Sequence, residues 1–288
     1  MCSSDLSLSY DKLESAVLDM KILVCSAGYV GSRVVEKFQS LGHEVEVLRK
    51  SNTPLAGVKT HSIDMSEKPT HLGSFDLVYI CLSAGDYSEE GYRKTYIDAY
   101  RNIVNSLDQD RLKKIIMVSS TSVFSQSEGQ WVREEDTSPS SFSGKVLLES
   151  EKMIAGFGKD FCVLRLSGIY GPGRASILKS VQEKKASYEE GESSFTNRIH
   201  IEDIVGFSAY AVSEGLSGTY NVSDSSPSRK NELLSHLAKL CGVELETKKP
   251  RPSLRRTNKK VSNKKMLETG YKLKYPNFVE AYADLIKI

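Results

Sequence analysis

The sequence predicts an α/β fold, in which a doubly wound parallel sheet is joined to a smaller C-terminal portion. Three observations lead to this prediction. Short apolar runs alternate with amphipathic stretches as far as residue 166, a turn of small residues follows the first apolar run, and the alternation loosens after residue 167. Strands that alternate with helices are typical of parallel sheets covered by helices on both faces.

The strands are predicted from short runs that are apolar or that alternate in polarity. The fourth run, FDLVYICL, is almost entirely apolar, as expected of a strand covered on both faces. The expected strands are 22–24, 44–48, 58–64, 75–82, 113–120 and 161–166, with a further one at 219–223.

The helices are predicted from apolar residues at helical spacing. The first carries Val34, Val35, Phe38 and Leu41, and the one at 144–157 has an apolar stripe that includes Val146 and Leu147. Further helices are expected near 89–107, 176–185, 202–213, 229–241 and 277–287, with a Ser/Pro-rich loop at 121–140 and a turn cluster at 168–174.

Composition excludes several classes of protein. The 288 residues include 39 basic and 37 acidic side chains, and this near-balance argues against a dedicated nucleic-acid or membrane-surface binder. No apolar run approaches the roughly 20 residues that span a bilayer. Five scattered cysteines without a C-x-x-C pair favour a reduced, cytoplasmic location. No metal site is expected, because the histidines show no ligand spacing.

The segment CSAGYVG at 25–31 joins the first strand to the first helix. Such a turn lets a pyrophosphate approach the backbone at the positive end of a helix dipole. In the Rossmann pattern G-x-G-x-x-G, Gly28 and Gly31 take the second and third positions and Ser26 takes the first; in the related G-x-x-G-x-x-G spacing the first position is Cys25. The alternative is an ordinary strand-to-helix turn. The residues expected to bind a dinucleotide here are Cys25, Ser26, Gly28, Tyr29, Val30 and Gly31.

The end of the second strand indicates which dinucleotide binds. Arg49 and Lys50 offer cations to a 2′-phosphate, which favours NADP over NAD, unless both are only solvated surface charges. Asp64, after the third strand, is an expected adenine contact. Leu82 and Ser83, after the fourth strand, complete the expected cofactor-binding set.

We expect three parts in the chain. Residues 1–19 lack a basic start followed by an apolar stretch, so they are expected to be a poorly ordered leader and not a signal peptide. Residues 20–166 form the expected dinucleotide-binding domain. Residues 167–288 form a smaller substrate-binding portion, of which about 200–224 returns to the first domain.

Several strings resemble the extended short-chain dehydrogenase/reductase superfamily, and within it the NAD-dependent epimerase/dehydratase group and its atypical YeeZ-like branch. The resemblance runs from about Met20 to Ile288. Its matching strings are CSAGYVG (25–31), VSSTSVF (118–124), RLSGIYGPGR (165–174), NRIHIEDIV (197–205) and TYNVSD (219–224).

The resemblance implies a set of catalytic positions. Ser120 corresponds to the residue that hydrogen-bonds the substrate oxygen, with Thr121 and Ser122 as neighbouring alternatives. The family catalyst Y-x-x-x-K corresponds to SFSGK, so Lys145 is present and Ser141 stands at the Tyr position. A serine hydroxyl is too weak an acid to exchange a proton as a Lys-assisted phenol does.

Three interpretations of this departure stay open. In one, another group is the acid or base. In another, Ser120 and Lys145 orient a substrate while water supplies the proton. In the last, the protein binds a dinucleotide without turnover. The alternative acids and bases are Tyr87, Tyr92, Tyr96, Tyr170, Glu134, Glu135 and Asp136.

The substrate contacts are expected in the C-terminal half. In related enzymes this surface holds an anionic or sugar-nucleotide substrate, so Arg174, Arg198 and Tyr170 are the expected contacts. His200 is expected to be structural. The basic run at 248–260 is either a solvated loop or a phosphate clamp that uses Arg255 and Arg256.

The leading hypothesis is an NAD(P)-dependent oxidoreductase or epimerase that acts on a small polar, or nucleotide-sugar, substrate. The alternative is a non-catalytic dinucleotide-binding sensor or scaffold. The expected partner is a small-molecule substrate. A homodimer through the helices at 89–107 and 144–157 is also compatible with the resemblance.

Overall fold

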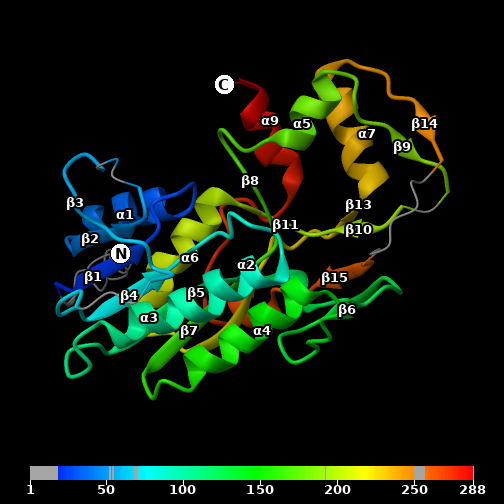
Figure 1. The fold of residues 1–288 in the computed structure, drawn as a ribbon. Coiled ribbons are helices and arrows are strands. Elements are labelled where there is room, and N and C mark those ends of the chain that lie inside the picture. The colour runs from blue at the N-terminus through cyan, green and yellow to red at the C-terminus, as the bar shows by residue number, and fades with distance from the viewer. Residues whose placement is uncertain are drawn as a thin grey trace, which may run out of the picture.

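A computed structural model describes residues 19–51, 53, 55–67, 71–191, 193–249 and 257–287. Its centre is a seven-stranded sheet in the order β12-β7-β5-β4-β1-β2-β3 (Figure 1). Every neighbouring pair is parallel, so the predicted fold class is confirmed. The strands are β1 (Lys21–Cys25), β2 (Glu44–Arg49), β3 (Lys59–Ser62), β4 (Leu77–Ile80), β5 (Lys114–Ser120), β7 (Asp160–Leu166) and β12 (Gly218–Val222).

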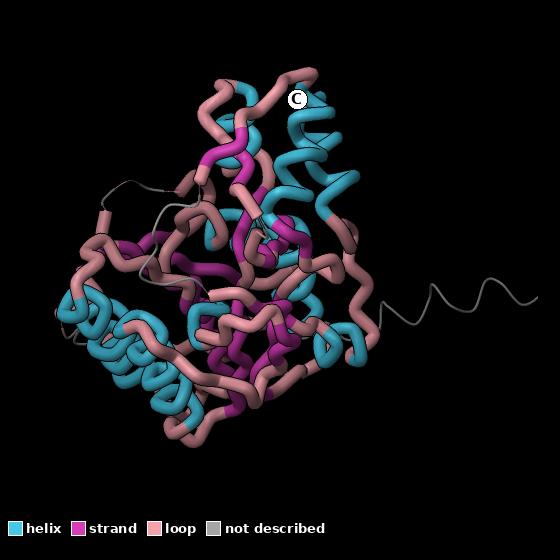
Figure 2. Tube along the Cα trace, turned by 90° about the vertical axis from the view of Figure 1, so that its right-hand side faces the viewer, coloured by secondary structure: helices cyan, strands magenta, loops and turns pink. Residues whose placement is uncertain are grey.

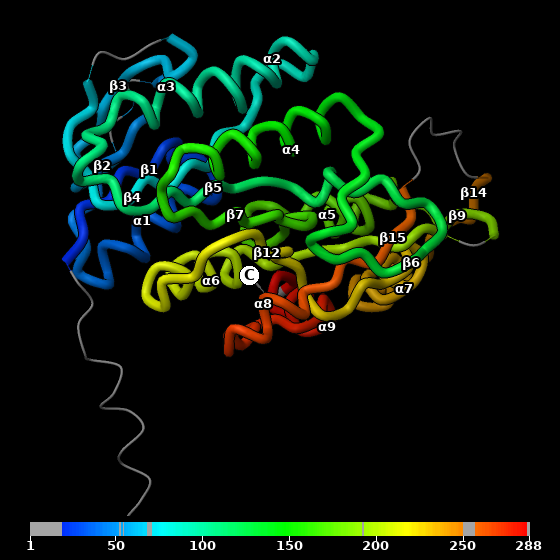
Figure 3. The backbone as a smooth tube through the Cα atoms, turned by 90° about the horizontal axis from the view of Figure 1, so that it is seen from below, coloured from blue at the N-terminus to red at the C-terminus, as the bar shows by residue number. Residues whose placement is uncertain are grey.

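Helices cover both faces of this sheet (Figure 3). One face is covered by α1 (Gly31–Ser40) and α6 (Ile201–Ser213), which also pack on each other. The other face is covered by α3 (Ala99–Asn105) and α4 (Phe142–Ala155). Two apolar cores result, one on each side of strands that are buried on both faces.

The helix predicted at 89–107 is divided into three parts. These are α2 (Glu89–Arg93), the π-helical turn η2 (Lys94–Asp98) and α3. A π-turn inserts an extra residue into a helix and frequently marks a functional site. Here it lies beside a cavity described below.

The smaller C-terminal portion has a separate core above the central sheet in Figures 1 and 2. It contains α5 (Ser176–Gln182), α7 (Lys230–Cys241) and α9 (Phe278–Lys287). The chain at 201–222 lies instead with the sheet, because α6 packs on α1 and β12 pairs with β7. The remaining helix, α8 (Lys264–Glu268), lies against β12.

Short strands lie inside two segments that were predicted to be irregular. The predicted turn cluster at 168–174 contains β8 (Gly168–Tyr170), which pairs with β11 (Arg198–His200). The predicted loop at 121–140 contains the 3₁₀ turn η3 (Thr121–Val123) and β6 (Gln130–Val132), which pairs with β15 (Lys259–Val261). The other short strands are β9 (Tyr188–Glu189), β10 (Phe195–Thr196), β13 (Ser228–Arg229) and β14 (Thr247–Lys248).

Two predictions fall on residues outside the described ranges. These are the leader, of which residue 19 alone is described, and the phosphate clamp of Arg255 and Arg256. Among the helices of the described ranges, none combines the length and the apolar character that crossing a membrane requires.

Candidate functional site

In the turn between β1 and α1, a serine adopts a backbone conformation that is typical of glycine. Ser26 has a φ of 80°, in the left-handed region, which costs a residue with a Cβ about 1–2 kcal/mol. A Cβ on Gly31 would lie 1.9 Å from the Ser26 carbonyl oxygen, so only glycine fits there. A Cβ on Gly28 would meet nothing closer than 3.8 Å. The turn therefore has the shape of the expected motif without its first glycine.

The thiol of Cys81 forms hydrogen bonds with the backbone of this turn. Its Sγ donates to the carbonyl oxygens of Ser26 at 3.1 Å and Cys25 at 3.3 Å. The Cys25 side chain is fully buried in the core on the opposite face of the sheet, and burial raises the pKa of its thiol well above the usual range. The Cys25 side chain therefore offers no contact to a ligand.

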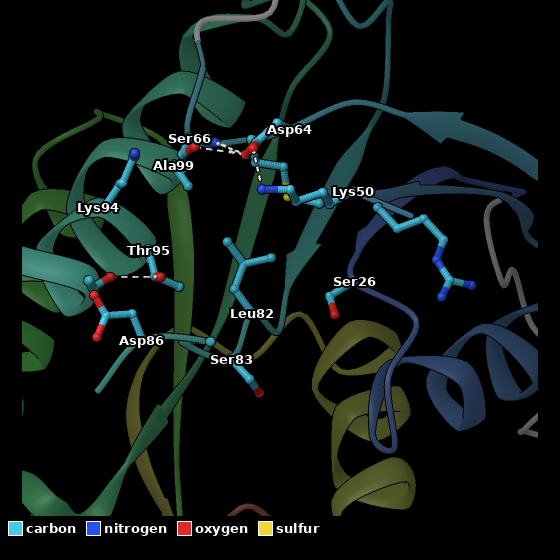
Figure 4. Close-up of a pocket in the computed structure, with 14 residues that line it drawn as sticks. Ser26, Lys50, Asp64, Ser66, Leu82, Ser83, Asp86, Lys94, Thr95 and Ala99 are labelled. Atoms are coloured by element: carbon cyan, nitrogen blue, oxygen red, sulfur yellow. Dashed lines mark hydrogen bonds and ion pairs between the residues drawn. The ribbon is translucent and has the colours of Figure 1, made fainter. Parts of the chain in front are cut away.

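A cavity of about 540 Å³ opens beside the turn, and we call it the strand-end cavity. It lies where β1, β2 and β4 end, which is where parallel sheets bind ligands. Predicted cofactor contacts that line it are Ser26, Arg49, Lys50, Asp64, Leu82 and Ser83 (Figure 4). Lining residues that the sequence did not indicate are Met65, Ser66, Gly85, Asp86, Gly91, Lys94, Thr95 and Ala99.

The two cations at the end of β2, Arg49 and Lys50, differ in whether a carboxylate neutralises them. Lys50 Nζ lies 2.6 Å from Asp64 Oδ2 (Figure 4), and hydrogen bonds from Lys50 and Ser66 lower the pKa of Asp64 to about 2. Arg49 donates to the Thr53 carbonyl oxygen at 3.1 Å and has no carboxylate partner among the described residues. Arg49 thus keeps an uncompensated charge, whereas Lys50 does not.

A second cavity, of about 390 Å³, shares Leu82 and Ser83 with the first, and we call it the serine-rich cavity. The two cavities adjoin at these residues, and we refer to them together as the cleft. Its other lining residues come from four segments of the fold. They are Tyr92 and Tyr96, Val118 to Ser122, Ser143 and Leu147, and Leu166 to Ile169 together with Arg174.

Helix α4 presents a different pair of residues to this cavity than the sequence indicated. Ser143 and Leu147 line it, whereas Lys145 is exposed. Ser141 caps the helix, and its Oγ accepts a hydrogen bond from the Gly144 amide at 3.0 Å. Lys145 is two residues, or about 200° of rotation, from either lining residue. The described lining of this cavity therefore includes neither Ser141 nor Lys145, which the resemblance places at the catalytic positions.

The physical reason is the packing of α4 on η3. A Cβ on Gly144 would lie 2.5 Å from the Ser122 carbonyl oxygen, so the glycine lets the helix approach closely and sets its rotation. Leu147 belongs to the apolar stripe that predicted this helix. A side chain that faces the pocket has to lie beside that stripe. The stripe could therefore have predicted that Ser143 and Leu147, and not Ser141 and Lys145, face the pocket.

Comparison with known proteins identifies the family. Residues 20–194 match the RmlD substrate binding domain family. The chain belongs to this family. A structure from Methylobacillus flagellatus, assigned to the NAD-dependent epimerases/dehydratases, is 30% identical over 94% of this chain and 98% of that chain, with a TM-score of 0.77. The predicted resemblance to the extended short-chain dehydrogenases/reductases is confirmed.

Two further relatives extend the comparison. Protein YeeZ of Escherichia coli K12 is 29% identical over 151 residues, which are 52% of this chain and 54% of the relative. The chain thus spans about half the length of the curated relatives that it matches. The UDP-glucose 4-epimerase of Thermus thermophilus, solved with NAD, is 20% identical over 93% of this chain and 99% of that chain, with a TM-score of 0.75. It shares the fold.

Neither of the two phenols among the described lining residues of the serine-rich cavity has a lowered pKa. Tyr92 and Tyr96 line the serine-rich cavity, but burial raises the pKa of both, so they stay protonated hydrogen-bond donors. No carboxylate, histidine or lysine is among its lining residues that the structure describes. In the described ranges, no group of three or more acidic, histidine or cysteine side chains is placed to hold a metal ion.

The other predicted acids and bases lie outside the serine-rich cavity. Tyr87 is 77% exposed, and the Glu134 carboxylate accepts a hydrogen bond from the Asn221 amide at 2.8 Å. Glu135 and Asp136 line a separate hollow beside β6.

Two predicted substrate contacts are part of the C-terminal core. Tyr170 is 3% exposed and stacks on Tyr282, with ring centroids 4.8 Å apart. Arg198 is buried, and its guanidinium lies 5.3 Å from the Phe278 ring centroid. Neither lines the cleft, so both predictions are corrected. Arg174 does line the serine-rich cavity.

His200 has the structural role that its sequence position indicated. Its Nδ1 accepts a hydrogen bond from the Glu202 amide at 3.3 Å and caps α6. Burial lowers its pKa to about 4, so the ring is neutral at physiological pH.

Proposed function

We propose that this chain binds a nicotinamide dinucleotide along the cleft and acts on a small polar substrate as an oxidoreductase or epimerase. One observation carries the proposal. The strand-end and serine-rich cavities share Leu82 and Ser83 in their linings, which supports a single ligand that extends from Arg49 to Ser120. An extended dinucleotide requires a path of this kind, with its phosphates at the turn between β1 and α1.

The residues that line the cleft fit a nicotinamide dinucleotide. Gly31 lets the turn close and Gly28 has open space beside its Cα, so a pyrophosphate can approach the backbone at the start of α1. Arg49 would hold a 2′-phosphate, which favours NADP over NAD. When bound, such a cofactor supplies or accepts a hydride.

The chain's own groups would bind and orient the substrate. Ser120 is at the end of β5, and its Oγ accepts the Ser122 amide at 3.2 Å, which leaves its hydroxyl proton available to a substrate oxygen. Tyr92 and Ser143 lie on neighbouring walls of the same cavity. The described lining residues include no carboxylate, histidine or lysine, so the proton that accompanies hydride transfer is exchanged with water.

Fluorescence titration with NADPH and NADH tests the proposal. We expect tighter binding of NADPH and a loss of that preference in Arg49→Gln. Arg133→Gln, at an exposed arginine outside the cleft, is the matched control. Failure to bind either nucleotide would overturn the proposal, and tighter binding of NADH would overturn the role of Arg49.

A specific observation also favours the non-catalytic alternative. Leu147 faces the cavity on the same side of α4 as Ser143, one turn later, where a lysine paired with a tyrosine would have to stand. A dinucleotide-binding sensor would need no such pair. Tight NADPH binding without turnover of any substrate in a broad panel would support the sensor. Turnover that Ser120→Ala reduces at unchanged NADPH affinity would support the enzyme.

A further inference from the structure

The serine-rich cavity contains one formal charge among its described lining residues, and that charge belongs to Arg174. Tyr92 and Tyr96 are neutral because burial raises the pKa of each phenol. In the described ranges no carboxylate lies within ion-pair distance of Arg174, which is an exposed residue at the cavity rim. The cavity therefore presents a single uncompensated positive charge to its contents.

Arg174 is held in place by its backbone and by an aromatic ring. Its amide donates to the Gly171 carbonyl oxygen at 2.9 Å, and the Gly171 amide donates back at 3.2 Å. The guanidinium carbon lies 5.6 Å from the ring centroid of Tyr29, within the range of a cation–π contact. This arrangement positions the cation without neutralising it.

The lining of this cavity is rich in hydroxyl groups. Thr121 and Ser122 line it beside Ser120, and their side-chain oxygens have no partner among the described residues. Ser83 lies at the junction with the strand-end cavity. Hydroxyls that can both donate and accept are suited to the hydroxyls of a sugar or another polyol.

We propose that the serine-rich cavity takes a sugar acid, whose carboxylate binds Arg174 while its hydroxyls face Ser120, Thr121 and Ser122. The proposal rests on the function proposed above and names its substrate class. Guanidinium and carboxylate form a bidentate pair of matched charge. A phosphate monoester carries about 1.5 to 2 negative charges at pH 7, more than the one cation here compensates.

Binding to the NADPH-saturated protein tests this proposal, measured by isothermal titration calorimetry. The probes are D-glucuronate, D-galacturonate and D-gluconate, with D-glucose, D-glucose 6-phosphate and UDP-glucose for comparison. We expect at least one sugar acid to bind tenfold or more tightly than each of the three comparison compounds. Arg174→Gln should remove that preference, and Arg133→Gln should keep it.

The outcomes separate the two proposals. NADPH binding without a preference for any sugar acid would overturn the substrate class and leave the cofactor site standing. Tighter binding of D-glucose 6-phosphate or UDP-glucose would overturn it in the same way. Failure of NADPH itself to bind would overturn the proposed function, and the substrate class with it. A preference that survives in Arg174→Gln would overturn the role of the arginine.

Discussion

The hydroxyl of Tyr29 donates a hydrogen bond of 2.9 Å to the backbone carbonyl oxygen of Pro172, across 143 residues of chain. Tyr29 belongs to the turn between β1 and α1, and Pro172 belongs to the loop that carries Arg174. The Tyr29 ring also lies 4.2 Å from the guanidinium carbon of Arg33. The expected cofactor turn and the expected substrate loop are therefore in direct contact through one side chain.

Tyr29→Phe should loosen the loop without disturbing the turn. The change removes the hydroxyl and keeps the ring, and one such hydrogen bond contributes about 1 kcal/mol. We expect amide hydrogen exchange at Gly171 and Arg174 to become about fivefold faster. Tyr87→Phe, at an exposed tyrosine, should leave that exchange unchanged. Equal protection in Tyr29→Phe would show that the loop is held by its own backbone pair alone.

Gly31→Ala and Gly28→Ala should separate folding from binding. A Cβ at Gly31 would overlap the Ser26 carbonyl oxygen at 1.9 Å, so we expect a loss of about 2–3 kcal/mol in the free energy of unfolding, measured with urea. At Gly28 the nearest atom is 3.8 Å away, so stability should change by less than about 0.5 kcal/mol.

Gly28→Ala should still weaken NADPH binding by tenfold or more, because its Cβ would point into the space that a pyrophosphate needs. Fluorescence titration provides the measurement. Unchanged NADPH affinity in Gly28→Ala would mean that the dinucleotide does not pass over this turn.

The central sheet could be predicted because its signals are local. Each strand is a short apolar run and each helix an apolar stripe, so β2 and α7 were expected within a few residues of their observed bounds. The pairing of β6 with β15 could not be predicted, since it joins segments about 130 residues apart. Neither three-residue strand has a pattern of its own.

The candidate site could be located from the sequence where a motif position determines the place of a residue in the fold. Gly31 and Arg49 lie where their motif positions indicated. Tyr170 and Arg198 did not meet their expected roles, because membership of a motif string does not show whether a side chain faces a cleft or a core. Whether these two side chains face the cleft or the core depends on α9, which lies more than 75 residues further along the chain and covers both side chains.

Lys145→Ala should change NADPH affinity by less than twofold, because the side chain lies on the exposed face of α4. Ser143→Ala, two residues earlier, removes a hydroxyl that lines the serine-rich cavity. If the protein turns over a substrate, its kcat/KM should fall by tenfold or more in Ser143→Ala and stay within twofold in Lys145→Ala. The reverse result would show that α4 presents SFSGK to the cleft after all.

Asp224 is buried beside the two corrected residues of the C-terminal core. It is 1% exposed, and its Oδ2 and the Tyr170 hydroxyl both lack a hydrogen-bond partner among the described residues. Burial raises the pKa of Asp224 from 3.8 to about 7, although the charge of Arg198 opposes this shift. The folded state therefore holds a proton that the unfolded chain releases between these pH values.

Asp224→Asn should stabilise the protein most at high pH. A raised carboxyl pKa contributes stability below about pH 4, and this contribution is lost as the pH rises through about 7. About three pH units at about 1.4 kcal/mol each set a limit of about 4 kcal/mol for the gain in unfolding free energy at pH 8. Urea unfolding at pH 8 and pH 4 should show the gain at pH 8 alone, and Asp110→Asn, at an exposed carboxylate, should show none. A less stable Asp224→Asn at pH 8 would instead mean that the carboxylate is charged and stabilised by Arg198.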